Sequence, residues 1–69
     1  MAISPKQARV FCDLSQKEVA ENLKVHRQTY MKWERNPNEM PVGKAQQFSK
    51  LVGRRVDEIF FEPQSTLSG

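Results

Sequence analysis

The chain has 69 residues, enough for one small domain, and its single cysteine cannot form an internal disulfide. Eleven lysines and arginines against eight acidic residues give a net charge of +3, which permits an anionic partner without requiring one. No apolar run approaches the roughly 20 residues that span a bilayer, and the first residues lack the apolar core of a signal peptide. We therefore expect a cytoplasmic protein with no membrane partner, folded around packed helices.

Few residues carry reactive chemistry. The one histidine and one cysteine provide no cluster for a metal, and the sequence has no glycine-rich phosphate loop and no catalytic Ser/His/Asp or Cys/His set in a supporting context. We therefore expect no enzymatic activity, no metal, no cofactor and no small-molecule ligand. Cys12 is interpreted as a buried apolar residue, because a free thiol in a small protein more often packs than reacts.

Capping residues mark the first helix start. Ser4 can accept a hydrogen bond from a backbone N–H, Pro5 suits the first helical position, and Gln7 stands at the spacing of a capping box. This pattern predicts a helix from Pro5 to about Cys12.

A second capping box opens the next helix. Ser15 is followed three residues later by Glu18. The apolar residues that follow at helical spacing are Val19, Ala20 and Leu23. Only residues 24–26 separate this helix from a third one, which begins at about Arg27 and is limited by Pro37. Two short helices joined by a tight turn predict a helix-turn-helix.

The C-terminal half predicts two further helices after a loop. The stretch NPNEMP, residues 36–41, reads as a loop because of its prolines and asparagines. The next helix spans about Val42 to Leu51, with Gly53 as its C-cap. Its apolar residues are expected on one side, which packs in the core: Val42, Ala45, Phe48, Leu51 and Val52. A fifth helix spans about Val56 to Phe61, and residues 62–69 are expected to be a flexible C-terminal tail. The predicted fold is all-α, a compact five-helix bundle in one domain over residues 1–61.

Positive charge is concentrated in the third helix and the turn before it. Residues 24–35 contain four bases and one acid, which accounts for the whole net charge of +3. Gln28 and Lys32 are one helical turn apart and share a face, which Arg27 borders. The residues expected to turn inward are Tyr30 and Trp33. The outward residues form either a solvated helix face or a surface for DNA, because Arg and Lys donate to guanine, and Gln both donates to and accepts from adenine.

These patterns together resemble a known family. The chain is similar to the helix-turn-helix signature of the XRE family, which includes phage Cro proteins and phage repressors, in Leu14-Ser15-Gln16, Val19-Ala20, Leu23, Val25, Arg27-Gln28-Thr29 and Lys32-Trp33-Glu34. The later stretch LVGRRVDEIF resembles the family's last two helices, so the likeness covers about Ser4 to Phe60. It implies a lambda-repressor-like DNA-binding domain whose third helix enters the major groove.

The resemblance also implies roles for individual residues. The positions that would read DNA bases are occupied by Arg27, Gln28 and Lys32. Arg27, at the border of the face, could bind a phosphate instead. The positions that would contact backbone phosphates are occupied by Gln16 and Arg35. Arg9 falls where the family places an arginine that pairs with the glutamate matching Glu34, which implies a partly buried ion pair between the first and third helices.

Two residues depart from the family pattern. Lys24 occupies the turn position where glycine is usual, because the backbone there tends toward positive φ. His26 replaces the usual Ser or Thr cap of the third helix. At both positions we expect a contact with a DNA phosphate. A neutral His26 could instead accept a hydrogen bond from one of the first amides of the third helix.

The implied function is a transcriptional regulator that binds double-stranded DNA. Its length resembles a Cro-like repressor of phage or prophage type, which would read a near-palindromic operator as a homodimer. Phe61 is the candidate dimer interface, because it follows Phe60 and only one of the two can easily face the core. The alternative is a protein-interaction module on the same fold, such as an antitoxin or a modulator of a repressor, whose main partner is a protein.

Overall fold

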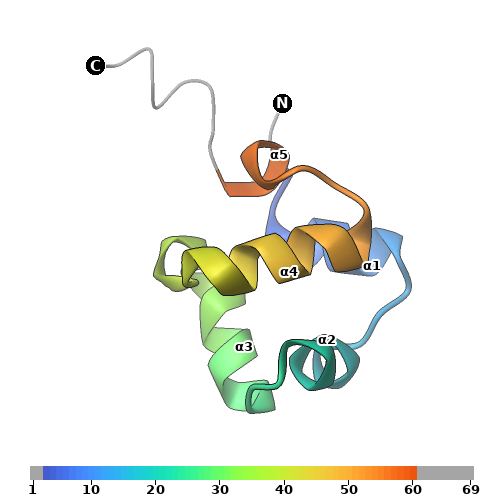
Figure 1. Cartoon of the computed structure of the whole chain (residues 1–69). Helices are drawn as coiled ribbons and strands as arrows, with labels where there is room; N and C mark the ends of the chain where they lie inside the picture. Colours follow the sequence, from blue (N-terminus) through green and yellow to red (C-terminus); the bar gives the residue numbers. More distant parts are fainter. Residues whose placement is uncertain (1–2, 61–69) are drawn as a thin grey trace.

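Five α-helices and one 3-10 turn make up residues 3–60, the part of the chain that this computed structural model describes (Figure 1). In chain order they are α1 (Pro5–Phe11), α2 (Gln16–Leu23), α3 (Arg27–Arg35), the 3-10 turn η1 (Pro37–Glu39), α4 (Val42–Val52) and α5 (Val56–Phe60). The predicted all-α five-helix bundle is confirmed. Phe61 and residues 62–69 lie outside the described residues, so the domain boundary and the interface expected there stay predictions.

The core lies between α4 and the other helices. In Figure 1, α4 crosses the centre of the molecule, with α2 and α3 below it and α5 above it. Phe48 of α4 is fully buried, and its ring centroid lies 6.0 Å from that of Tyr30 on α3 and 6.3 Å from that of Phe60 on α5. One aromatic side chain of α4 therefore connects the third helix to the last one.

Both predicted capping boxes are present. Ser4 Oγ accepts from the backbone N–H of Gln7 at 3.0 Å, and the Gln7 side chain accepts from the Ser4 N–H at 2.9 Å. Ser15 and Glu18 repeat this reciprocal pair at 3.0 and 2.8 Å. A cap of this kind stabilises a helix by about 1 kcal/mol. The start of α2, and hence the place of the helix-turn-helix in the chain, is set by local hydrogen bonds.

The turn between α2 and α3 has a left-handed residue at its first position. Lys24 has φ 60° and ψ 45°, the positive φ that the sequence analysis expected there. Val25 N–H then reaches back to the carbonyl of Ala20 at 3.0 Å. A side chain in this conformation crowds the following carbonyl, at a cost on the order of 1 kcal/mol. The tight turn is therefore formed against the preference of its own residue.

Lys24→Gly should raise the melting temperature of the protein. Glycine adopts positive φ without a steric penalty, and a gain of about 1 kcal/mol corresponds to roughly 4 to 8 °C in a domain of this size. Thermal unfolding followed by circular dichroism measures the change. Lys24→Ala is the matched control, since it removes the charge but keeps the strained backbone. A lower melting temperature for Lys24→Gly would contradict the prediction.

The loop predicted over residues 36–41 separates α3 from α4 and contains the 3-10 turn η1, which the Met40 N–H closes on the Pro37 carbonyl at 3.1 Å. Two other expectations from the sequence are wrong. Cys12 is exposed rather than buried, because α1 ends at Phe11 and leaves Cys12 in the turn at the surface. Val42 is 72% exposed, because it is the first residue of α4, and the buried residues of this helix start one turn later, at Ala45. Over residues 3–60, no helix has the length and apolar character needed to cross a membrane.

Candidate nucleic-acid interface

Two aromatic residues fix the orientation of α3. Tyr30 is fully buried and Trp33 is 8% exposed, as the sequence analysis expected of both. They lie on one side of the helix and pack into the hydrophobic core. The opposite side of α3 must therefore face away from the molecule.

The side chains on that opposite side are long and polar. Gln28 and Lys32 are exposed and one turn apart, and Arg35 follows three residues later on the same face. Arg27, the first residue of α3, is exposed at the border of this face. The structure thus brings together all three proposed base readers, and adds Arg35 to the face that carries two of them.

Two further proposed contacts lie at the start of α3. Lys24 and His26 are both exposed in the turn that leads into the helix. His26 stands at the N-cap with extended backbone but makes no side-chain cap hydrogen bond. The first amides of α3 therefore lack a side-chain partner at the cap, and an anion at this end of the helix would meet them.

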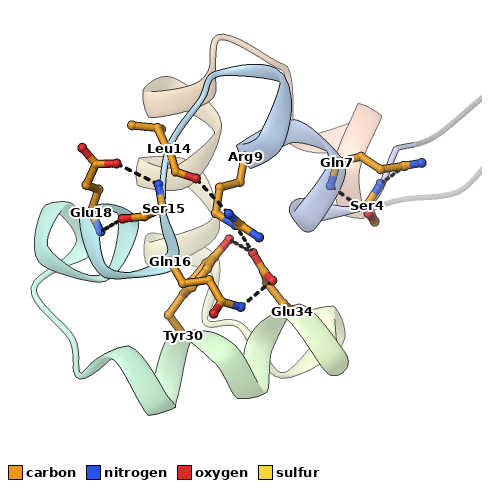
Figure 2. A network of polar contacts seen from close by, with 9 residues as sticks. All are labelled: Ser4, Gln7, Arg9, Leu14, Ser15, Gln16, Glu18, Tyr30 and Glu34. Carbon is orange, nitrogen blue, oxygen red and sulfur yellow. Dashed lines mark hydrogen bonds and ion pairs between the residues drawn. The ribbon is translucent and has the colours of Figure 1, made fainter.

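A buried carboxylate joins α1, α2 and α3. Three side chains donate hydrogen bonds to Glu34, as Figure 2 shows. Arg9 Nε and the Tyr30 hydroxyl both donate to Glu34 Oε2, at 2.6 and 2.7 Å. Gln16 Nε2 donates to Oε1 at 2.9 Å. Arg9 also donates to the carbonyl of Leu14 at 2.8 Å. The ion pair expected between Arg9 and Glu34 is present, and the Tyr30 hydroxyl has a buried partner. Only 13% and 6% of the Arg9 and Glu34 side chains are exposed.

Hydrogen bonding decides the ionisation of this carboxylate. Burial alone raises the pKa of Glu34, but hydrogen bonds from Arg9, Tyr30 and Gln16 favour its charged form and leave the pKa below its ordinary value of 4.5. Burial, together with the hydrogen bond to the Glu34 carboxylate, raises the pKa of Tyr30 far above its usual range. At neutral pH the cluster therefore holds a charged Glu34 and a neutral Tyr30.

The Glu34 carboxylate should make the protein sensitive to acid. Because its pKa is lower in the folded than in the unfolded chain, its stabilising effect is complete above about pH 4.5 and is lost as the pH falls through the lower folded-state value. We expect the melting temperature to fall more steeply below pH 4.5 for the native protein than for Glu34→Gln. Glu21→Gln, which changes an exposed acid on α2, should keep the native slope. Equal slopes for all three proteins would contradict the prediction.

Gln16 has a second role that the sequence analysis missed. Its amide was expected to contact a phosphate from the first position of α2, but one N–H donates to Glu34. An amide nitrogen carries two hydrogens, so the second remains for an anion. The bond to Glu34 joins residues 18 apart in the chain, and no local pattern of the sequence signals such a contact.

Two more residues at this surface were not anticipated. Lys44 of α4 donates from Nζ to the carbonyl of Leu23 at 2.6 Å and so satisfies the C-terminal end of α2. Glu39 of η1 places Oε1 3.3 Å from Lys32 Nζ. The sequence carries no signal for the first contact; for the second, the signal is the single acid in the stretch NPNEMP.

The geometry defines a class of protein. Helices α2 and α3, joined by a left-handed turn, form a helix-turn-helix whose second helix presents basic and amide side chains outward. A family model described as Helix-turn-helix matches residues 6–59, so the chain belongs to the XRE-type helix-turn-helix family and, in general terms, is a DNA-binding transcription regulator. The comparisons with curated proteins and with solved structures each gave no match.

Proposed function

We propose that the protein is a Cro-like repressor that reads its operator with Arg27, Gln28 and Lys32. The observation that carries the proposal is the exposed face of α3 opposite two buried aromatic residues. Arginine and lysine donate to guanine O6 and N7, and glutamine forms two hydrogen bonds with adenine. A helix held by its aromatic face leaves these side chains free to enter the major groove.

Phosphate contacts should position this helix on the duplex. The proposed contacts lie at the start of α2, in the turn before α3 and at the end of α3: Gln16, Lys24, His26 and Arg35. All but half-buried Gln16 are exposed, and the acid Glu34 within the same segment is turned inward to Arg9. Such contacts fix the register on DNA and carry no sequence information themselves.

A second copy of the chain completes the proposed reader. A single module of this kind covers only about 600 to 1,000 Å² of protein surface, which is small for selective binding. Two copies around a two-fold axis would read half-sites about 34 Å apart, so the operator should be a near-palindrome. Phe61 is the residue we propose for the dimer contact. The repressor would act in the cytoplasm by occupying a promoter, without catalysis, cofactor or small-molecule effector.

Selection of bound duplexes from a randomised DNA pool tests the proposal. The selection is run at one fixed salt concentration, because phosphate contacts make affinity strongly dependent on salt. Enrichment of a two-fold symmetric site would support a dimeric sequence reader. Failure to enrich any sequence would reject sequence-specific DNA binding, and a monomer both free and on DNA in ultracentrifugation would reject the homodimer.

One surface feature favours the alternative function, a module that binds a protein. A groove of about 310 Å³ runs between η1, α4 and α5, and its apolar lining includes Pro37, Met40, Val42, Ala45 and Phe60. A groove with an apolar lining of this kind fits an apolar side chain of a partner protein. If the selection from random DNA enriches nothing, an antitoxin or repressor modulator that uses this groove becomes the better assignment.

A further inference from the structure

We propose that Glu39 is a specificity-determining residue of the DNA interface: its ion pair with Lys32 weakens binding to phosphates more than binding to a matched base. The inference rests on the proposed function, in which Lys32 reads a base edge. It concerns a residue outside the helix-turn-helix itself, in the turn that follows α3.

The carboxylate of Glu39 is placed by a short ordered turn. Pro37 begins η1, the Glu39 N–H donates to the carbonyl of Asn36 at 2.9 Å, and the next residue, Met40, is 7% exposed in the core. From this position Glu39 Oε1 lies 3.3 Å from Lys32 Nζ. Both side chains remain open to solvent, at 49% and 60% exposure, so the pair lies at the surface that DNA would approach.

Among the basic residues of this surface, Glu39 affects only Lys32. Two acids occur in residues 24–39, and Glu34 is committed to the buried cluster around Arg9. Glu39 is thus the acid of this segment that meets a proposed base reader. Within residues 3–60, Arg27 and Arg35 take part in no ion pair, so the effect of Glu39 falls on Lys32.

The two modes of DNA binding treat this pair differently. A lysine that only grips phosphate gains from its full charge, which the carboxylate neutralises, and the carboxylate also repels the phosphate. A lysine that reads guanine donates to O6 and N7, and its ammonium has a third donor that can stay with Glu39. The pair therefore weakens binding to random DNA while allowing the oriented contact to a base.

The experiment compares native protein, Glu39→Gln and a control on two duplexes, the one enriched by selection and one of random sequence. Each cation–phosphate contact makes the affinity fall with roughly the 0.9 power of the salt concentration. At about 0.1 M salt, one added contact therefore strengthens binding by up to about eightfold. We expect Glu39→Gln to bind the random duplex about three- to eightfold more tightly and the enriched duplex less than about twofold more tightly. The specificity ratio, which is the affinity for the enriched duplex divided by the affinity for the random one, should fall accordingly.

Asp13→Asn is the matched control. Asp13 is exposed in the turn between α1 and α2, forms no ion pair within residues 3–60, and has φ 58°, which asparagine tolerates. This variant removes the same charge without touching Lys32, so its specificity ratio should equal that of the native protein. In a Lys32→Gln background, Glu39→Gln should change binding to random DNA no more than the control does.

Four results would overturn the inference. Equal gains on both duplexes would show that Glu39 only repels DNA at long range. A gain that persists in the Lys32→Gln background would show that it does not act through Lys32. A native protein that prefers no sequence would reject the proposed function, and the role of Glu39 with it. A native protein that prefers the enriched duplex, but no more strongly than Glu39→Gln does, would reject only the role of Glu39.

Discussion

Arg9→Ala should lower the free energy of unfolding by about 3 kcal/mol or more, because it leaves the Glu34 carboxylate buried without its counter-charge. Arg9 Nε lies 2.6 Å from Glu34 Oε2, and both side chains are almost entirely buried. Small domains have a total stability of about 5 to 15 kcal/mol, so the loss is a large share of it. The melting temperature should fall by about 12 to 24 °C.

An exposed pair at the start of α5 provides the comparison for this result. Arg55 binds Asp57 at 2.7 Å, but the two side chains are 77% and 54% exposed. Such surface pairs contribute little to stability, so Arg55→Gln should leave the melting temperature nearly unchanged. If Arg9→Ala and Arg55→Gln shift the melting temperature by the same small amount, the Arg9–Glu34 pair does not hold α1 to α3.

Gln28→Ala should reduce affinity for the enriched operator by about 5- to 150-fold, because a bidentate contact to a base discriminates by roughly 1 to 3 kcal/mol. The loss should be confined to operators that carry the matching base at one position of each half-site. Binding to random DNA should change little. Because Gln28 is exposed, the free energy of unfolding of Gln28→Ala should stay within about 0.5 kcal/mol of the native value.

Two variants separate base reading from other effects. Gln47→Ala removes an exposed glutamine on the outer face of α4 and should bind both duplexes as the native protein does. Arg35→Ala, at a proposed phosphate contact, should weaken all sequences alike and reduce the salt slope by about one. A uniform loss in Gln28→Ala, matching that of Arg35→Ala, would reassign Gln28 to a phosphate.

Local rules were enough to predict the helices and the buried face of α3. The capping boxes at Ser4 and Ser15 each involve residues three apart, so the sequence pattern contains the whole interaction. The inward positions of Tyr30 and Trp33 follow from helical periodicity alone. The left-handed backbone of Lys24 was predicted instead from the resemblance to a family that has glycine at this position.

Contacts between distant segments could not be read in this way. Gln16 meets Glu34 and Lys44 meets the Leu23 carbonyl only because α2, α3 and α4 pack together. Cys12 was misassigned because its burial depends on where α1 ends relative to the core. Family resemblance supplied the Arg9–Glu34 pair, which joins residues 25 apart and has no local signature.

The residues that hold α3 in the core and the residues proposed to read DNA lie on opposite sides of the helix. This separation affects how the protein can evolve. Tyr30, Trp33 and Glu34 hold the helix in place, whereas Gln28 and Lys32 make no buried contact. Substitutions on the outward side should therefore leave the free energy of unfolding nearly unchanged, and the protein stays above the stability that it needs to function. If these side chains read bases as proposed, new operator preferences are accessible through single substitutions, without a compensating mutation in the core. For the same reason, the scaffold should accept a reading face designed for another site.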